Sequence, residues 1–305
     1  QARANNWSSL PGCTHVTVQV FDDRSCSLGE GPLWHPMRNQ LFWFDIIGKK
    51  LLSVDAEGPK SWQFDEFVSA AGWVDIDTLL VASASGLWRF NLTTGDRSLL
   101  CHLEHNNAVT RSNDGRADPW GGFWIGTMGI DANPAAGAIY RYYQGTLKRL
   151  FPEITISNAI CFAPDRSFAY FTDTPTRQVM RVPLDRNGWP AAEPSVFIDI
   201  RSEALNPDGA VVDAQGNLWI AQWGAGQIAG YDDQGRFLRV LKVPAIQVTC
   251  PAFGGPEYGA MYVTSAANGL APDVIERTPT QGMTFKVEAG VTGLPEPKVI
   301  LLNAH

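Results

Sequence analysis

The sequence predicts an all-β protein folded as a six-bladed β-propeller, and three observations carry this prediction. Short runs of β-forming residues alternate with Gly, Asp, Asn and Pro, whereas long stretches with a helical period are absent. Six of these runs resemble one another, and successive copies end 38, 44, 46, 49 and 43 residues apart. A repeat of about 40–50 residues is typical of a blade made of four short strands. The six runs end at positions 45, 83, 127, 173, 222 and 265.

The other strands of each blade follow from the same repeat. Turns such as Thr94-Gly95 and Asn187-Gly188 come after a further β-forming run and reverse the chain. Because an open ring would expose two sheet edges, we expect the two ends of the chain to pair. Residues 16–20 should add a strand to the last blade, beside residues 284–287. The further β-forming runs lie at residues 87–90, 138–141, 179–182 and 227–231.

We expect one propeller domain over residues 1–305, with residues 1–15 as an irregular N-terminal extension. Length alone would suggest about two domains, but a propeller of this size often forms a single unit. The alternative is a two-sheet sandwich or two separate β domains. No linker-like shift in composition occurs along the chain, which favours the single propeller.

Composition and charge limit the classes of partner. Apolar residues make up 45% of the 305 residues and charged residues 18%, which is enough apolar material for a large packed core. The net charge is −7 and no Lys/Arg cluster occurs, so nucleic acid and anionic membranes are poor candidates as partners. No apolar run reaches the roughly 18 residues that cross a bilayer. A monomer and a weak homodimer are both compatible with this composition.

The cysteines predict neither a thiolate zinc site nor a disulfide framework. They are odd in number and widely spaced, and no CxxC occurs. We expect reduced and mostly buried thiols, with one oxidised pair as the alternative. The first residues lack the charged-then-apolar pattern of a signal peptide, so we expect a cytoplasmic protein. The cysteines are Cys13, Cys26, Cys101, Cys161 and Cys250.

One acidic or amide side chain recurs at the same place in four of the six repeats. Glu30 and Asn158 lie 15 residues before the end of their second run, and Asn113 and Asp208 lie 14 residues before it. Their motifs are LGEGP, ISNA, SNDG and NPDG. The first strand of each blade lines the central channel, so equivalent positions should converge at one end of that channel. Each motif alone is also an ordinary turn sequence, and the shared spacing is what favours a site.

The converging side chains predict a metal site in the channel. Glu30, Asn158 and Asp208 would supply two carboxylates and one amide carbonyl. This hard-oxygen set suits Ca²⁺, Mg²⁺ or Mn²⁺ and is able to take Zn²⁺ or Fe²⁺. Three protein ligands leave positions for water and substrate, as metal-assisted hydrolysis requires. We expect one divalent ion, with Ca²⁺ and Zn²⁺ ahead of the others.

Three further residues near these motifs each have two interpretations. Arg111 lies two residues before Asn113 on the same strand, so both could face the channel. Its guanidinium would hold a carboxylate or a hydroxyl-rich ligand, or would pair with Asp208 or Asp118. Asp118 precedes a proline and a Gly-Gly turn, which fits a hairpin better than a ligand. Trp223 would stack on a sugar ring or fill the core.

With these residues in place, the chain resembles the gluconolactonase/regucalcin (senescence marker protein 30) family of sugar lactonases. The resemblance covers nearly the whole chain, through LGEGPLWHP, RSNDGRADPWGGFWIGTM, ISNAICFAPDRSFAYFTDT, NPDGAVVDAQGNLWIAQW and CPAFGGPEYGAMYVTSA. It implies a propeller that opens sugar lactones such as gluconolactone to aldonic acids. It implies a single divalent metal held by Glu30, Asn158 and Asp208. It also implies that Asp208 is the general base and that Arg111 and Asn113 contact the substrate.

The sequence departs from the family at one place. Animal regucalcins carry an acidic substrate-contact residue just after GTM, where this chain reads GIDAN. Asp131 is the acidic residue nearest to that place. The Gln222-Trp223 pair resembles bacterial sugar-lactone hydrolases more than animal members. The particular sugar is therefore left open by the sequence.

Three other functions are compatible with a polar channel to different degrees. A non-catalytic calcium-binding or sugar-sensing propeller would use the same ligands without a catalytic water. A phosphotriesterase-like activity would share the metal but prefer organophosphate esters. A scaffold propeller that binds peptides would have no reason to place carboxylates in its channel. Hydrolysis of aldonolactones with and without a chelator separates these functions from a lactonase.

Overall fold

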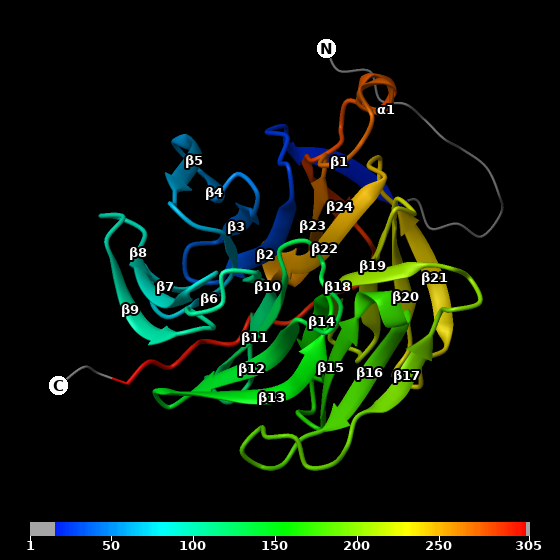
Figure 1. The fold of residues 1–305 in the computed structure, drawn as a ribbon. Coiled ribbons are helices and arrows are strands. Elements are labelled where there is room, and N and C mark those ends of the chain that lie inside the picture. Colours follow the sequence, from blue (N-terminus) through cyan, green and yellow to red (C-terminus); the bar gives the residue numbers. More distant parts are fainter. Residues whose placement is uncertain (1–15, 303–305) are drawn as a thin grey trace.

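The computed structural model describes residues 16–302 as six four-stranded sheets around a central channel (Figure 1). All neighbouring strands within the sheets run antiparallel, so the predicted six-bladed β-propeller is confirmed. The first blade consists of β2 (Gly29–His35), β3 (Gln40–Asp45), β4 (Lys50–Asp55) and β5 (Gly58–Gln63). The second consists of β6 (Val68–Trp73), β7 (Thr78–Ser83), β8 (Gly86–Asn91) and β9 (Arg97–His102). The third consists of β10 (Thr110–Ala117), β11 (Phe123–Gly129), β12 (Gly137–Tyr143) and β13 (Thr146–Ile154). The next two consist of β14 (Ser157–Phe162), β15 (Phe168–Asp173), β16 (Gln178–Pro183) and β17 (Ser195–Asp199); and β18 (Asn206–Val212), β19 (Leu218–Trp223), β20 (Gln227–Tyr231) and β21 (Phe237–Lys242).

The sixth blade closes the ring with strands from both ends of the chain. It contains β22 (Gln247–Gly254), β23 (Ala260–Ala266), β24 (Thr284–Glu288) and β1 (Thr17–Asp22), in that order. Val18 pairs with Val287 and Val20 with Phe285, as we expected from the exposed edges of an open ring. The ring therefore has no unpaired seam.

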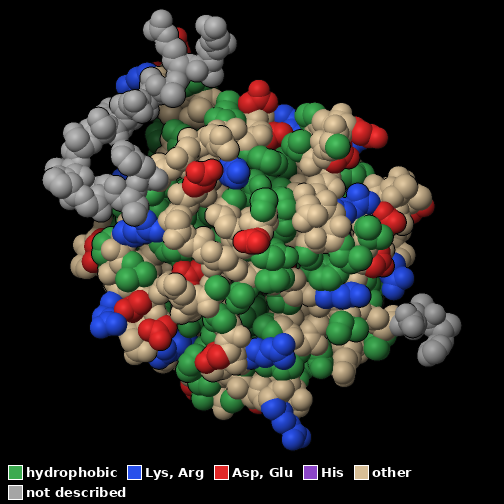
Figure 2. Space-filling model, turned by 180° about the vertical axis from the view of Figure 1, so that it is seen from behind, with side chains coloured by type: hydrophobic (Ala, Val, Ile, Leu, Met, Phe, Trp, Pro, Cys, Tyr) green, Lys and Arg blue, Asp and Glu red, His purple; other side chains and the backbone are tan. Residues whose placement is uncertain are grey.

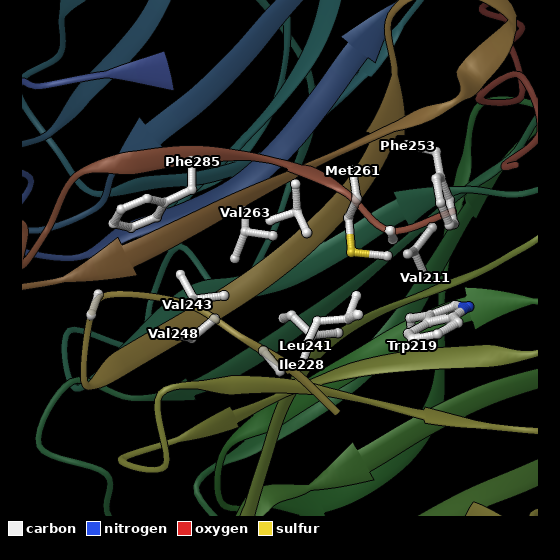
Figure 3. Close-up of a cluster of buried hydrophobic side chains, with 14 residues drawn as sticks. Val211, Trp219, Ile228, Leu241, Val243, Val248, Phe253, Met261, Val263 and Phe285 are labelled. Carbon is white, nitrogen blue, oxygen red and sulfur yellow. The ribbon is translucent and has the colours of Figure 1, made fainter. Parts of the chain in front are cut away.

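The channel is lined by the first strand of each blade. The strands β2, β6, β10, β14, β18 and β22 pack on one another around the axis. Apolar layers fill the space between adjacent blades. Figure 3 shows one such layer, in which Trp219 and Ile228 of the fifth blade belong to the same cluster as Met261 and Phe285 of the sixth. Because these layers fix the blades relative to one another, they also fix the side chains that point into the channel.

A C-terminal strap, residues 289–302, crosses the far end of the channel, where the first strands end. It is held by backbone hydrogen bonds to four blades. Gly293 N–H donates to Tyr258 O, and Val299 N–H donates to Trp73 O. The strap thereby ties together blades that are far apart in the ring, and it closes the channel opposite the predicted site.

Helical structure is confined to short segments in the described chain. The helix α1 (Pro272–Arg277) lies between β23 and β24, and two 3₁₀ turns cover Thr174–Thr176 and Pro256–Tyr258. Sequence reasoning did not predict α1. Its signals are weak and local: Pro272 in the first turn, Asp273 beside it and Arg277 in the last turn.

The surface and the cysteines agree with the composition. The face in Figure 2 carries acidic and basic side chains scattered among apolar ones, without an extended basic patch. None of the described helices is long and apolar enough to cross a membrane. In the described chain, Cys26, Cys101, Cys161 and Cys250 are free thiols. Cys13 and the predicted extension over residues 1–15 lie outside the described residues.

A buried histidine at the far end of β2 makes stability depend on pH. The His35 side chain is 0% exposed, its Nε2 lies 2.9 Å from Asp75 O, and its Nδ1 has no partner. Burial lowers the pKa of His35 below its ordinary value of 6.5, because a charged imidazolium there would be desolvated with one N–H unbonded. As the pH falls, His35 therefore binds a proton in the unfolded chain before it does so in the folded chain. This contribution to the free energy of unfolding is present above about pH 6.5 and is lost as the pH falls.

We expect His35→Gln to remove that pH dependence. The measurement is urea unfolding of both proteins at pH 5.5 and 7.5. Wild type should lose more stability than the variant between pH 7.5 and 5.5, and taking the difference cancels the titration of other groups. Equal losses in the two proteins would contradict the assignment.

Candidate metal centre

The four side chains singled out by spacing lie at one level of the channel. In each of their blades the preceding residue pairs with the position that marks the repeat. Glu30, Asn113, Asn158 and Asp208 therefore occupy equivalent positions in their blades, and we call this level of the channel the ligand rung. Their side chains are buried, with 5, 5, 3 and 5% exposed. The pairs that establish this register are Gly29 with Asp45, Ser112 with Thr127, Ser157 with Asp173, and Pro207 with Gln222.

The same rung in the two other blades also carries polar residues, which sequence reasoning missed. They are Ser69, which follows Val68, and Thr249, which follows Val248. Their hydroxyls are used between blades: Ser69 Oγ donates to Ser112 Oγ at 2.7 Å, and Thr249 Oγ1 donates to Gly29 O at 2.6 Å. These two residues connect the first strands, whereas the other four supply the oxygen and nitrogen atoms of the site.

Every first strand is irregular at this level, where its pairing with the second strand shifts register. Such β-bulges re-aim side chains and are common beside active sites. Two of the bulges use left-handed backbone directly after a candidate ligand. Gly31 has φ 55° after Glu30, and Ala159 has φ 59° after Asn158. A non-glycine residue in this region is strained, which is typical of functional positions.

Aspartates at the ends of two second strands fix the entry to their first strands. Asp45 accepts the N–H of Leu28 at 3.0 Å, and Asp173 accepts the N–H of Ile156 at 2.8 Å. Each bond is made two residues before a candidate ligand, Glu30 or Asn158. The 15-residue spacing in the sequence therefore has a physical cause in these two blades: the aspartate holds the chain from which the ligand projects.

Glu30 of β2 and Asp208 of β18 are both buried in the channel, close enough for the Glu30 charge to act on Asp208. Burial raises the pKa of Glu30 to about 8, with a further contribution from the Asp114 carboxylate. Burial, the Glu30 charge and the Asp114 charge raise the pKa of Asp208 well above its ordinary value. Two carboxylates this close cannot both ionise easily unless a cation lies between them.

The amide of Asn158 is oriented by a residue outside the predicted set. Thr174 Oγ1 donates to Pro207 O at 2.8 Å, so its single proton is already used. The hydroxyl must therefore accept from Asn158 Nδ2, which lies 2.9 Å away. That bond fixes Asn158 Oδ1 on the side of Asn113, whose Nδ2 donates to it at 3.1 Å, and leaves its second lone pair for a cation. Thr174 follows Asp173 in the FTDT motif, which was the signal available in the sequence.

Arg111 and Asn113 form the next part of the site. Arg111 Nη1 donates to Asn113 Oδ1 and to Ser112 O, both at 2.9 Å. Asn113 Nδ2 donates to Asn158 Oδ1 at 3.1 Å. Burial lowers the pKa of Arg111 to about 10, and the charges of Glu30 and Asp208 oppose that shift. A positive group thus lies near the two carboxylates, two residues before Asn113 on the same strand.

Asp114 is a third buried carboxylate that sequence reasoning did not assign. Its Oδ2 accepts the N–H of Ile160 at 2.7 Å, across the boundary to the next blade. Burial raises the pKa of Asp114 to about 6. The SNDG motif contained this residue, but strand alternation alone gave no reason to place it beside Glu30 and Asp208. The bulge after Ser112 supplies that reason.

The contacts bear on the residues that the sequence left with two interpretations. Asp118 accepts the N–H groups of Trp120 and Gly122 at 2.9 Å and pairs with Arg141 at 2.7 Å, so it is a hairpin residue as expected. Among the described residues, Arg111 forms no direct ion pair, with Asp118 or otherwise. Asp131 is exposed on the loop after β11, and Trp223 is half-buried at the end of β19. Neither residue lies on a first strand, at the level of Glu30, Asn113, Asn158 and Asp208.

The donor set fits a hard divalent cation. Two carboxylates and one amide oxygen lie at one level of the channel, and a cation there would allow both buried carboxylates to ionise. The third donor is an amide, so the described chain has no group of three His, Cys, Asp or Glu residues suited to a metal. Glu30, Asn158 and Asp208 are thus the residues that could hold an ion.

Comparisons with known proteins agree with this fold. A profile of the SMP-30/Gluconolactonase/LRE-like region matches residues 28–267. A pentonolactonase from Haloferax volcanii is 34% identical over 92% of this chain and 97% of its own. An L-arabinolactonase from Azospirillum brasilense is 34% identical over 90% of this chain and 93% of its own. The crystal structure of regucalcin, a calcium-binding protein from Agrobacterium tumefaciens, is 39% identical, with a TM-score of 0.90 over 92% of this chain and 96% of its own.

Proposed function

Because the chain belongs to the SMP-30/gluconolactonase/LRE-like family, we propose that it is a divalent-metal-dependent hydrolase that opens sugar lactones to aldonic acids. Its relatives include lactonases named for five-carbon sugar substrates. The observation that carries the proposal is that the buried Glu30 and Asp208 carboxyl groups lie at the same level of the channel as the oriented amide of Asn158. A small aldonolactone is the proposed substrate.

The residues have distinct roles in this proposal. Glu30, Asn158 and Asp208 hold the cation. When bound, a divalent cation supplies a Lewis acid for the lactone carbonyl and lowers the pKa of a coordinated water. Arg111 holds the ring hydroxyls or the emerging carboxylate through its planar fork of donors. Asn113 keeps Arg111 and Asn158 in place and contacts the substrate from the same rung.

Asp208 moves the proton. Opening a lactone joins a water oxygen to the carbonyl carbon, breaks the bond from that carbon to the ring oxygen, and leaves a proton to be transferred. Asp208 accepts this proton from the attacking water and returns it to the departing ring oxygen. A cation in the site would allow the buried Asp208 to be ionised and therefore able to accept the proton.

The test is metal-dependent lactone hydrolysis. The protein is stripped with chelator, and Ca²⁺, Zn²⁺, Mn²⁺, Mg²⁺ or Fe²⁺ is then added back singly. Each sample is assayed against pentono- and hexonolactones by proton release. Activity restored by one or more ions supports the proposal. Full activity without any ion would contradict the metal dependence.

A second function is favoured by one observation, namely the calcium-binding regucalcin relative. A calcium-binding propeller without catalysis would use the same three ligands. It would bind Ca²⁺ in the experiment above but hydrolyse none of the lactones.

Arg111→Lys is expected to impair substrate handling more than metal binding. Both hydrogen bonds of Arg111 use Nη1, and an ammonium cannot hold Asn113 and a ligand with a planar fork. We expect kcat/KM to fall about tenfold, mostly through a higher KM. Metal affinity, measured by calorimetry in the absence of lactone, should change little. An unchanged kcat/KM would remove Arg111 from the substrate site.

A further inference from the structure

We propose that Glu296, in the C-terminal strap, is a positioning residue that maintains the affinity of the metal site for its cation. It acts from the strap side of the channel. This inference rests on the proposed metal site. Glu296 lies outside residues 28–267, which the family profile matches, and none of the roles proposed above involves the strap. The connection runs through one buried arginine.

Arg116 joins the strap to the strands that carry two ligands. It lies on β10, and its Nε donates to Ile160 O and its Nη2 to Ala210 O, both at 3.2 Å. Ile160 is two residues beyond Asn158, and Ala210 is two residues beyond Asp208. Nη1 of the same guanidinium pairs with the Glu296 carboxylate. One side chain therefore links β10, β14, β18 and the strap directly beneath the ligand rung.

On β14, Arg116 binds the backbone within the bulge, where regular pairing with β15 is interrupted. The pairing of β14 with β15 shifts between Asn158 and Cys161, so Ile160 lies outside the regular ladder. Its N–H is bound by Asp114 and its carbonyl by Arg116. These two side chains thus replace the missing ladder bonds just below Asn158.

Glu296 lies close beneath the site. A cavity of about 10 Å³, roughly the room for one water, is lined by Glu296, Asp114 and Gly31, the residue after Glu30. The Glu296 side chain is buried, and its charge is the largest favourable influence on the Arg116 guanidinium. At this depth the pair is screened little by solvent.

Charge balance gives Glu296 its effect on the metal. Four buried carboxylates line this part of the channel, from Glu30, Asp114, Asp208 and Glu296, and two guanidinium groups, from Arg111 and Arg116. One divalent cation makes the sum neutral. Without the Glu296 charge, Arg116 would carry an uncompensated positive charge below the ion and would oppose its binding.

The strap's own attachment does not depend on the Glu296 carboxylate. Its backbone carbonyl accepts Trp73 Nε1–H at 2.8 Å, and the neighbouring strap is held by backbone bonds. Glu296→Gln therefore changes the charge while the strap keeps its place. Glu288, exposed at the end of β24, offers a matched control for the loss of one negative charge.

The experiment is calorimetric titration of chelator-stripped protein with Ca²⁺ and with Zn²⁺, well below the midpoint of thermal unfolding. We expect Glu296→Gln to bind about tenfold more weakly, as is typical when a partner behind the ligands is removed. Glu296→Asp should retain most of the affinity and Glu288→Gln all of it. Wild-type affinity in Glu296→Gln would overturn this inference alone. Failure of wild type to bind any of these ions would overturn the proposed metal site as well.

A double variant separates charge from packing. Arg116→Gln combined with Glu296→Gln restores the balance of charge but removes more contacts. It should bind the cation more tightly than Glu296→Gln alone. Weaker binding by the double variant would overturn the charge-based proposal, because lost packing would then explain both results.

Discussion

Asp208→Asn is expected to lower kcat/KM for lactone hydrolysis by at least about a thousandfold while the propeller stays folded. The carboxamide has nearly the same shape as the carboxylate, so the bulge of β18 and the blade packing should persist. It cannot accept the proton of the attacking water, and it is a weaker ligand for a cation. The loss therefore combines the base with one of three ligands.

The same substitution should leave the metal-free protein at least as stable as wild type. Glu30, Asp114 and Asp208 are buried carboxyl groups, and the charges of the first two repel an ionised Asp208 and raise its pKa. Removing one of them relieves this repulsion near neutral pH. Thermal unfolding in the presence of chelator should thus show an equal or higher midpoint, while the stabilisation by added cation becomes smaller. Activity and stability would change in opposite directions.

Asp213→Asn is the matched control on the same strand's hairpin. Asp213 is buried, and it accepts the N–H of Asn217 and the Nε1–H of Trp219, both at 2.9 Å. We expect a lower unfolding midpoint with cation affinity unchanged. If Asp208→Asn kept wild-type turnover with cation bound, or if both variants lost affinity equally, the role of Asp208 as ligand and base would be wrong.

The sequence was sufficient for the architecture because the propeller repeats its own pattern. In four blades the candidate residue lies 14 or 15 residues before the end of the second run, so positions 45, 127, 173 and 222 revealed both the period and the rung. The closing strand was predictable for a different reason, since an open ring would leave unpaired edges. The register of the structure confirms both inferences.

The parts of the site that sequence reasoning missed depend on irregular backbone and on contacts between distant segments. Asp114 faces Ile160 of the next blade because β10 bulges, and a bulge breaks the alternation on which strand reasoning relies. Thr174 orients Asn158 only because its proton is taken by Pro207 in another blade. Such partners follow from three-dimensional packing, which no local pattern in one strand reports.

Gly31→Ala is expected to have the second large effect, because it disrupts the bulge that aims Glu30. The Gly31 backbone has φ 55°, which disfavours any side chain. A methyl group there would overlap the Ser69 carbonyl oxygen and lie 3.2 Å from the Phe44 ring and 3.3 Å from the Ala70 Cα. Since backbone and core cannot yield easily, we expect a loss of at least about 3 kcal/mol in the free energy of unfolding.

Gly31→Ala should weaken cation binding as well as stability, because the strand that carries Glu30 would have to move. Gly31 N–H also donates to Glu30 Oε2 at 3.0 Å, so the carboxylate would lose its local anchor. We expect cation affinity to fall at least about tenfold in whatever fraction of the variant is folded. Urea unfolding gives the first quantity, and calorimetric titration at low temperature gives the second.

Gly95→Ala isolates the cost of the left-handed backbone from the cost of crowding. Gly95 has φ 75° in the turn between β8 and β9, and an added methyl group would meet nothing within 4 Å. This control should lose only about 1 kcal/mol and should bind cation as wild type does. The difference between the two variants then measures how closely Ser69 and Phe44 enclose the bulge. If Gly31→Ala cost no more than Gly95→Ala, the bulge would be pliable, and Glu30 would owe its position to the cation rather than to the fold.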